Sequence, residues 1–83
     1  MKVRIHPHAR DRMELRGASV EEVEVAVAKG EQFPAKHGRT GFRRNFAGAH
    51  AWRERMFDTK QIEVYAVLED GDWLVITVIV KFF

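Results

Sequence analysis

The chain contains no cysteine among its 83 residues. Without thiols it can form neither a disulfide nor a thiolate zinc site, and it cannot use a cysteine nucleophile. This composition permits a reducing compartment, and we expect a cytoplasmic location. Long apolar runs are also missing, so we expect no contact with a membrane. Because no apolar stretch follows Lys2 and Arg4, we expect no signal peptide.

The charges are segregated along the chain, whose length suits a single domain over residues 1–83. The segments 1–16, 17–35, 36–60 and 61–83 carry net charges of +3, −3, +5 and −3. We expect the first helix to pack near the strands that carry the second basic segment, which would make one surface suited to phosphate. Aromatic residues interleaved with the basic ones favour this interpretation, and ordinary solvated loops are the alternative.

Two helices are predicted in the N-terminal half. The first should begin at Pro7, whose ring presets the helical φ, and end before Gly17, a residue suited to a left-handed cap. The second is expected over residues 19–29, because Ser19 and Glu22 have the spacing of a capping box. Its apolar stripe of valines predicts packing against a sheet.

The C-terminal half has the alternation of β-strands. A short edge strand is expected over 31–36 and a second strand over 42–46, and the runs 61–68 and 73–80 flank Asp70-Gly71, a signal for a type I′ hairpin. That turn sets a register in which Leu68 faces Trp73, Ala66 faces Val75, Val64 faces Thr77, Ile62 faces Ile79 and Lys60 faces Lys81. The order predicts an α+β fold, with two N-terminal helices packed on one face of an antiparallel sheet of about four strands.

The last strand is apolar on both of its faces. In the predicted register, the face opposite Val75 carries Leu74, Ile76, Val78 and Val80. Two helices can cover only one face of the sheet, and small monomers rarely expose a contiguous apolar wall. We therefore expect this wall to be covered by a second copy of the chain or by another protein.

Several side chains suit metal-free RNA cleavage. This reaction needs a group that takes the 2′-hydroxyl proton, a group that protonates the leaving 5′-oxygen, and cations on the phosphate. We predict catalytic roles for His8, Tyr65 and Glu63. We predict phosphate contacts for Arg12, Arg43, Arg44, Lys60 and Lys81. His6 and His8 lack nearby carboxylate support for a metal, so we expect no metal and no other cofactor.

Structural roles are the alternatives for the same residues. His8 would then bond locally in the first helical turn, Arg12 would hold a strand end, and Tyr65 would be a buried aromatic of the sheet. Because side chains alternate along a strand, Arg43 and Arg44 face opposite sides, and only one of them can lie at a site on one face.

Most of the chain resembles a small bacterial family catalogued as domain of unknown function 4258. The resemblance lies in the motif HAxxRMxxRGA over 8–18, the capped second helix, and the stretches 33–36, 38–46, 59–66 and 73–82. The layout is similar to that of RelE-like ribonuclease toxins and the wider barnase-like group. This resemblance implies an RNA-cleaving toxin whose antitoxin lies on the basic face or the apolar wall.

Two hypotheses follow. The first is a metal-independent ribonuclease of toxin–antitoxin type that cleaves single-stranded RNA by general acid/base chemistry. The second is a non-enzymatic module that binds nucleic acid or protein through the same surfaces. The enzyme is favoured if His8 or Tyr65 lies within about 6–8 Å of Arg43 or Arg44 in a concave site, since one phosphate fits in such a space.

Overall fold

The computed structural model describes residues 2–83 and has an α+β fold built on a five-stranded sheet. The elements in chain order are β1 (Val3–Ile5), α1 (Pro7–Arg16), α2 (Val20–Lys29), β2 (Glu31–Pro34), β3 (Thr40–Trp52), β4 (Arg55–Glu69) and β5 (Asp72–Phe82). The spatial order of the strands is β1-β5-β4-β3-β2. The sheet is mixed, because β1 runs parallel to β5 while the other pairs are antiparallel. The predicted α+β class is confirmed, but the sheet has one strand more than the expected four and is mixed rather than antiparallel.

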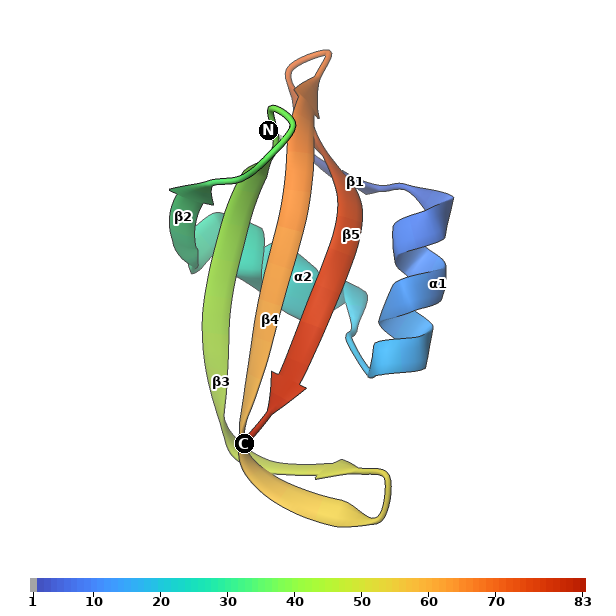
Figure 1. The fold of residues 1–83 in the computed structure, drawn as a ribbon, viewed down its shortest axis with the longest axis vertical. Helices are drawn as coiled ribbons and strands as arrows, with labels where there is room; N and C mark the ends of the chain where they lie inside the picture. Colours follow the sequence, from blue (N-terminus) through green and yellow to red (C-terminus); the bar gives the residue numbers. More distant parts are fainter. Residues whose placement is uncertain (1) are drawn as a thin grey trace.

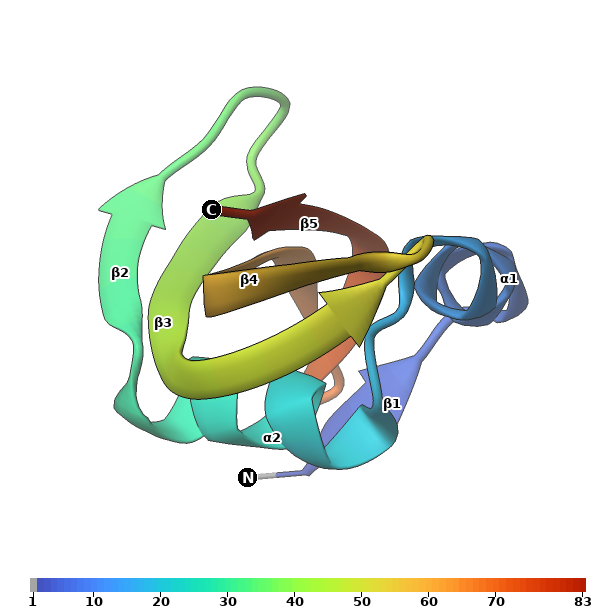
Figure 2. The same cartoon turned by 90° about the horizontal axis from the view of Figure 1, so that it is seen from below.

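The two helices occupy different places around the sheet. Helix α2 crosses behind β3 and β4, whereas α1 lies beside β5, on the flank away from β3 (Figure 1). Seen from below, the sheet is strongly curved, with α2 under one face and the β2–β3 loop rising on the other side (Figure 2). One face of the sheet is thus covered by α2, and the opposite face is left open.

Both helices begin and end where local signals place them. The ring Nδ1 of His6 accepts from the backbone N–H of His8 at 3.1 Å, and Gly17 closes α1 in the left-handed conformation with φ 78°. Ser19 and Glu22 form the expected capping box, with bonds of 2.9 and 3.1 Å. These caps rest on neighbouring residues alone, which is why the sequence predicts them.

The core lies between the helices and the covered face of the sheet. Its fully buried side chains include Val23 and Ala26 of α2 together with Ile62 and Val64 of β4. Ala9 and Met13 of α1 join the same core from the β5 side. Helix α1 also shields the free edge of β5, since the Arg16 guanidinium donates to the carbonyl of Val78 at 2.7 Å.

The hairpin of β4 and β5 follows the predicted register only near its turn. Asp70 and Gly71 form the turn with φ of 53° and 81°, and Ala66 faces Val75 as expected. Beyond this pair a β-bulge leaves Ile76 without a partner. The bulge reverses the faces of the rest of β5, so that Val64 pairs with Val78, Ile62 with Val80 and Lys60 with Phe82.

This bulge removes the predicted apolar wall. Val78 is fully buried on the helix side, and Val80 packs against the same core. The open face of β5 instead carries Thr77, Ile79 and Lys81 after the bulge. The prediction of an apolar wall made of Leu74, Ile76, Val78 and Val80 is therefore wrong. Without this wall, the fold does not indicate a partner that covers it.

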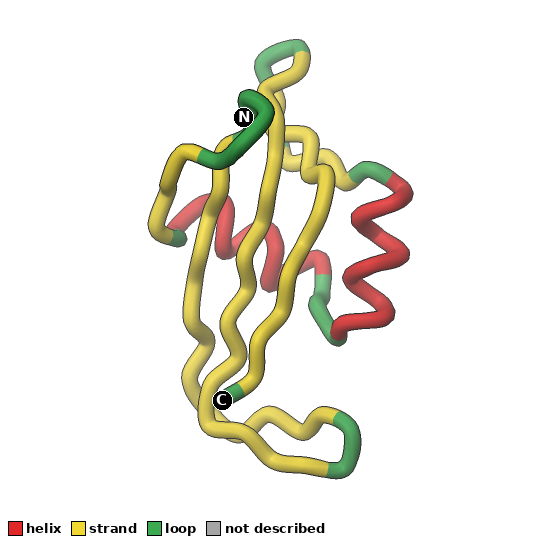
Figure 3. The backbone as a smooth tube through the Cα atoms, in the orientation of Figure 1, coloured by secondary structure: helices red, strands yellow, loops and turns green. Residues whose placement is uncertain are grey.

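Strand β3 is longer than expected and ends in a curled hairpin tip, as the tube drawing shows (Figure 3). The residues 47–51 lie beyond the strand predicted over 42–46, and they continue it after a second register shift between Ala47 and His50. At the tip, Trp52 stacks on Phe82 with ring centroids 5.4 Å apart. A Cβ on Gly17 would lie 2.7 Å from the Trp52 ring, so this glycine lets the tip pack against the corner between α1 and α2.

No helix among residues 2–83 combines the length and the apolar character needed to cross a bilayer.

Candidate functional site on the open face of the sheet

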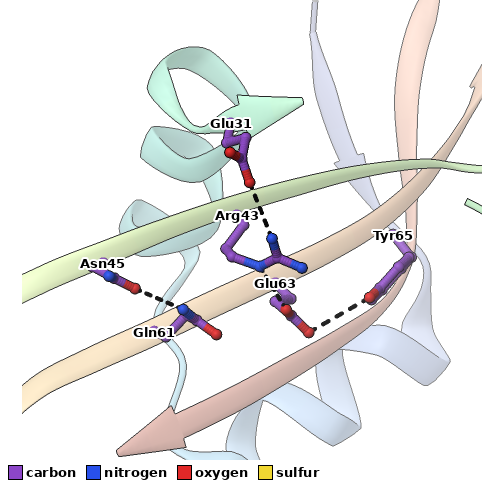
Figure 4. Close-up of polar contacts among 6 residues, drawn as sticks. All are labelled: Glu31, Arg43, Asn45, Gln61, Glu63 and Tyr65. Atoms are coloured by element: carbon purple, nitrogen blue, oxygen red, sulfur yellow. Dashed lines mark hydrogen bonds and ion pairs between the residues drawn. The ribbon is translucent and has the colours of Figure 1, made fainter. Parts of the chain in front are cut away.

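A polar network lies at the centre of the face that α2 leaves uncovered, which we call the open face. Glu31, Arg43, Asn45, Gln61, Glu63 and Tyr65 all project from it, and they belong to β2, β3 and β4 (Figure 4). The register places them there, because Glu31 faces Arg43 and Arg43 faces Glu63 across neighbouring strands. Cross-strand neighbours of this kind lie close enough for direct side-chain contact.

Arg43 is the hub of this network. Its Nε donates to Glu63 Oε2 at 2.7 Å, and its Nη1 donates to Glu31 Oε1 at 3.0 Å. The guanidinium carbon also lies 4.5 Å from the centroid of the Phe33 ring, in cation–π geometry. The hydrogen bond to Glu63 and the charges of both carboxylates raise the pKa of Arg43, while its partial burial opposes them. Arg43 is thus a fixed cation that holds Glu63 in place.

Glu63 is nearly inaccessible to solvent although it lies on the open face. Its side chain is 7% exposed, and its second oxygen, Oε1, faces the Tyr65 hydroxyl at 3.5 Å. Burial of Tyr65 raises the pKa of its phenol, and the negative charge of Glu63 raises it further. Tyr65 therefore keeps its proton at neutral pH, with the hydroxyl aimed at the carboxylate.

A concave site adjoins Tyr65, which we call the loop cleft. It has a volume of about 470 Å³. Its lining comes from the β2–β3 connection and from the three strands β2, β4 and β5, namely Phe33, Pro34, Ala35, Lys36, His37, Arg39, Tyr65, Thr77 and Ile79. Two cations and an imidazole therefore share one depression with the tyrosine.

Glycine and aromatic packing shape this cleft. Phe33 lies across Gly41, where a Cβ would come within 2.3 Å of the phenyl ring, so glycine is required there. The same ring meets Tyr65 edge-on, with centroids 6.0 Å apart. His37 and Gly38 both have positive φ, which folds the connection back over the open face.

The structure brings three predicted site residues together: Glu63, Tyr65 and Arg43. Both Arg43 and Tyr65 contact the carboxylate of Glu63, but of these two only Tyr65 lines the loop cleft, so they do not share the concave site that the enzyme hypothesis expects. Lys81 also lies on this face, opposite Gln61, and is exposed.

Four predicted site residues lie outside this network, namely His8, Arg12, Arg44 and Lys60. His8 is exposed in the first turn of α1, and Arg12 belongs to the same helix, which packs on β5. Arg44 points to the covered face, where its Nη1 donates to the carbonyl of Lys29 at the end of α2 at 3.3 Å. The alternation argument for Arg43 and Arg44 is therefore confirmed.

Lys60 is a structural residue in this fold. It is 9% exposed and its ammonium donates to the carbonyl of Gly17 and, at 2.7 Å, to Glu22 Oε1. It thus connects the end of α1 and the start of α2 to the sheet. We leave Lys60 out of the proposed site, because its contacts point away from the open face.

The two basic segments do not meet at Arg43 and Arg44, where they were expected to converge. Helix α1 packs on β5, and β4 separates that strand from β3 with Arg43 and Arg44. The cations at the loop cleft come instead from Lys36 and Arg39, together with His37. The sequence contains no signal for this, because only the fold of the connection brings these residues beside Tyr65.

Residues 2–83 contain no group of three or more His, Asp or Glu side chains arranged to hold a metal ion. No protein-family model matches the chain, and neither a curated protein nor a solved structure matches it. Membership of the family of unknown function 4258, and likeness to RelE-like toxins, stay predictions.

Proposed function

We propose that the chain is a ribonuclease that cleaves single-stranded RNA in the loop cleft by general acid/base chemistry without a metal ion. One observation carries the proposal. Tyr65, whose hydroxyl lies beside the Glu63–Arg43 ion pair, borders a cleft that also contains His37, Lys36 and Arg39. A proton donor, a proton acceptor and cations are the parts that this reaction needs.

Tyr65 is assigned as the general acid. Because its pKa is raised, it is protonated at neutral pH and can deliver its proton to a leaving oxygen. Glu63 is a positioning residue in this scheme rather than a base, since its 7% exposed side chain is out of reach of a substrate hydroxyl. The negative charge of Glu63 orients the phenol of Tyr65, and the ion pair with Arg43 holds the Glu63 carboxylate in place.

His37 is assigned as the general base. Imidazole is the side chain that most often transfers protons near neutral pH. His37 takes the proton of the 2′-hydroxyl, whose oxygen attacks the adjacent phosphorus. The bond from phosphorus to the 5′-oxygen breaks, and Tyr65 protonates that oxygen. The products are a 2′,3′-cyclic phosphate and a 5′-hydroxyl.

Lys36 and Arg39 are assigned to the phosphate, because both line the cleft. Arg43 was one of the five residues predicted for this role, but it already pairs with two carboxylates. Phe33 and Ile79 supply an apolar surface for a nucleobase, which stacks on aromatic groups without regard to sequence.

The test is cleavage of a labelled single-stranded RNA by purified protein with EDTA present. Tyr65→Phe should leave RNA binding intact and lower the cleavage rate by about 10²–10⁴, and His37→Gln should act in the same way. His8→Gln is the matched control, since that histidine is exposed on α1. Cleavage that Tyr65→Phe and His37→Gln both leave unchanged would indicate a contaminating nuclease and end the assignment.

A second candidate is a nucleic-acid-binding module without catalysis. The observation that favours it is the bonding of Glu63, whose two carboxylate oxygens both face groups of the protein itself. In that case the network only stiffens the sheet, and the cations bind RNA. Salt-dependent binding without cleavage of any RNA would establish this candidate in place of the first.

A further inference from the structure

A second depression lies at the free edge of β5, between the tip of the β3–β4 hairpin and the end of α1, and we call it the tip cleft. It has a volume of about 550 Å³. Its lining consists of Leu15, Arg16, Trp52, Arg53, Thr77, Ile79, Val80 and Phe82. Thr77 and Ile79 also line the loop cleft. The two clefts therefore adjoin at Thr77 and Ile79 of β5, and we call them together the trough. Tyr65 pairs with Thr77 on the neighbouring strand.

The tip cleft has the same mixture of cations and apolar surface as the loop cleft. Arg53 is exposed, with its guanidinium carbon 5.4 Å from the Trp52 ring. Arg16 donates one N–H to the carbonyl of Val78, which is one of the five N–H groups that a guanidinium offers. Leu15 is 61% exposed beside them and adds apolar surface to the cleft.

The turn that carries Arg53 supports a role for this side chain. Arg53 and Glu54 have φ of 50° and 67°, the left-handed values of a type I′ turn. Asparagine and glycine are the residues that adopt this turn most easily, and other residues cost conformational energy there. The strained turn lies at the rim of the tip cleft and places a cation over it.

We propose that the tip cleft is a second nucleotide subsite, so that the protein takes a single strand of several nucleotides along the trough. This proposal rests on the proposed function. It adds how long the bound RNA strand is and where it lies on the protein. A chain of phosphates and bases fits the trough because cations occur at both ends, Lys36 and Arg39 at one and Arg16 and Arg53 at the other. Aromatic and apolar surface lies beside each pair, as in single-strand binding grooves.

The experiment measures binding without cleavage, so that the two proposals can fail separately. Fluorescein-labelled RNAs with a 2′-O-methyl group on every ribose cannot undergo the reaction. A dinucleotide and an octanucleotide of this kind are titrated by fluorescence anisotropy. The octanucleotide should bind at least about tenfold more tightly, because stacking and phosphate contacts at the second subsite add to the first.

Two arginines of the same hairpin give a matched pair of variants. Arg53→Gln should remove most of the preference for the octanucleotide and reduce the salt slope by about 0.7, the value for one phosphate contact on a single strand. Arg55→Gln should leave the preference for the octanucleotide and the salt slope unchanged, since Arg55 packs over Phe57 and does not line the trough. A Trp73→Phe background makes Trp52 the only tryptophan, and its fluorescence should respond to the octanucleotide more than to the dinucleotide.

Equal affinity for both lengths, or an octanucleotide preference that Arg53→Gln leaves unchanged, would overturn the second subsite and leave cleavage in the loop cleft standing. Failure of wild type to bind either RNA would overturn the subsite and the proposed function together. Competition by polyglutamate as strong as by RNA would assign the trough to an acidic protein segment and also overturn the inference.

Discussion

The two faces of the sheet use charged side chains in opposite ways. On the covered face, Lys60 and Arg44 donate to main-chain carbonyls at the ends of helices. On the open face, Arg43, Glu31 and Glu63 pair with one another beside Tyr65, which lines the loop cleft. Charges of the first kind satisfy carbonyl groups at helix ends, which lack a partner within the helix. Charges of the second kind hold each other in fixed positions, and Glu63 in turn faces the hydroxyl of Tyr65.

The largest expected difference between the two faces is in the unfolding free energy lost when a side chain of β4 is truncated. Ile62 is fully buried under the helices, whereas its neighbour Gln61 lies on the open face. Ile62→Ala should lower the free energy of unfolding by about 2–5 kcal/mol, because it leaves a cavity in the core. Gln61→Ala should change it by about 0.5 kcal/mol or less. Urea denaturation measures both, and equal losses would mean that the faces do not differ in packing.

The next effect concerns the lysine that joins the helices to the sheet. Lys60→Met should cost about 2–3 kcal/mol of unfolding free energy, because it leaves Glu22 and the Gly17 carbonyl without their buried donor. Lys81→Met on the open face is the control and should be nearly neutral, since Lys81 is exposed. A neutral Lys60→Met variant would show that the buried contacts do not matter for stability.

Lowering the pH should weaken the same contact between Lys60 and Glu22, with a smaller loss of stability than the Lys60→Met substitution. Burial alone would raise the pKa of Glu22, but hydrogen bonds from Lys60 and Ser19 outweigh it and lower the pKa below its ordinary value of 4.5. A lowered pKa in the folded state stabilises the fold above pH 4.5, and this stabilisation is lost as the pH falls through the folded value. Unfolding followed between pH 6 and 3 should show the loss. It should shrink in Lys60→Met, and an unchanged acid profile there would contradict the assignment.

The smallest effect is a spectroscopic one on the open face. Tyr65 is the only tyrosine in the chain, so its phenolate absorbance can be followed without overlap from another tyrosine. Its titration midpoint should lie above the ordinary value of about 10. Glu63→Gln should lower the midpoint, because the neighbouring negative charge is removed. A midpoint that does not move would mean that Glu63 does not act on the phenol.

Much of the fold follows from local patterns. The helix caps at Gly17 and Ser19 and the turn at Asp70-Gly71 each depend on a few adjacent residues, and the sequence predicts all three. No local sequence pattern marks the bulge at Ile76, because β5 is apolar on both faces and either register buries valines. A single unpaired residue therefore reverses the faces of half a strand without changing the hydrophobic pattern.

The candidate site was predictable only where alternation decides it. The period of two separates Arg43 from Arg44 and places Glu63 and Tyr65 on one face. The role of Lys60 depends on a contact with Gly17, 43 residues away, and no local pattern predicts such a contact. His37 and Arg39 reach Tyr65 through the path of a connection whose shape comes from positive φ values at its turn.

The parallel pairing of β1 with β5 has a consequence for how the chain folds during synthesis. The backbone N–H of Trp73 donates to the carbonyl of Lys2 at 2.9 Å, and Val3 faces Trp73 in the ladder. The surfaces on which α1 and α2 pack belong to strands that the ribosome makes later. At about 5–20 residues per second, both helices wait for seconds before β4 and β5 exist. We therefore expect the nascent helices to remain open to chaperones and proteases until the last hairpin forms and closes the core over them in one step.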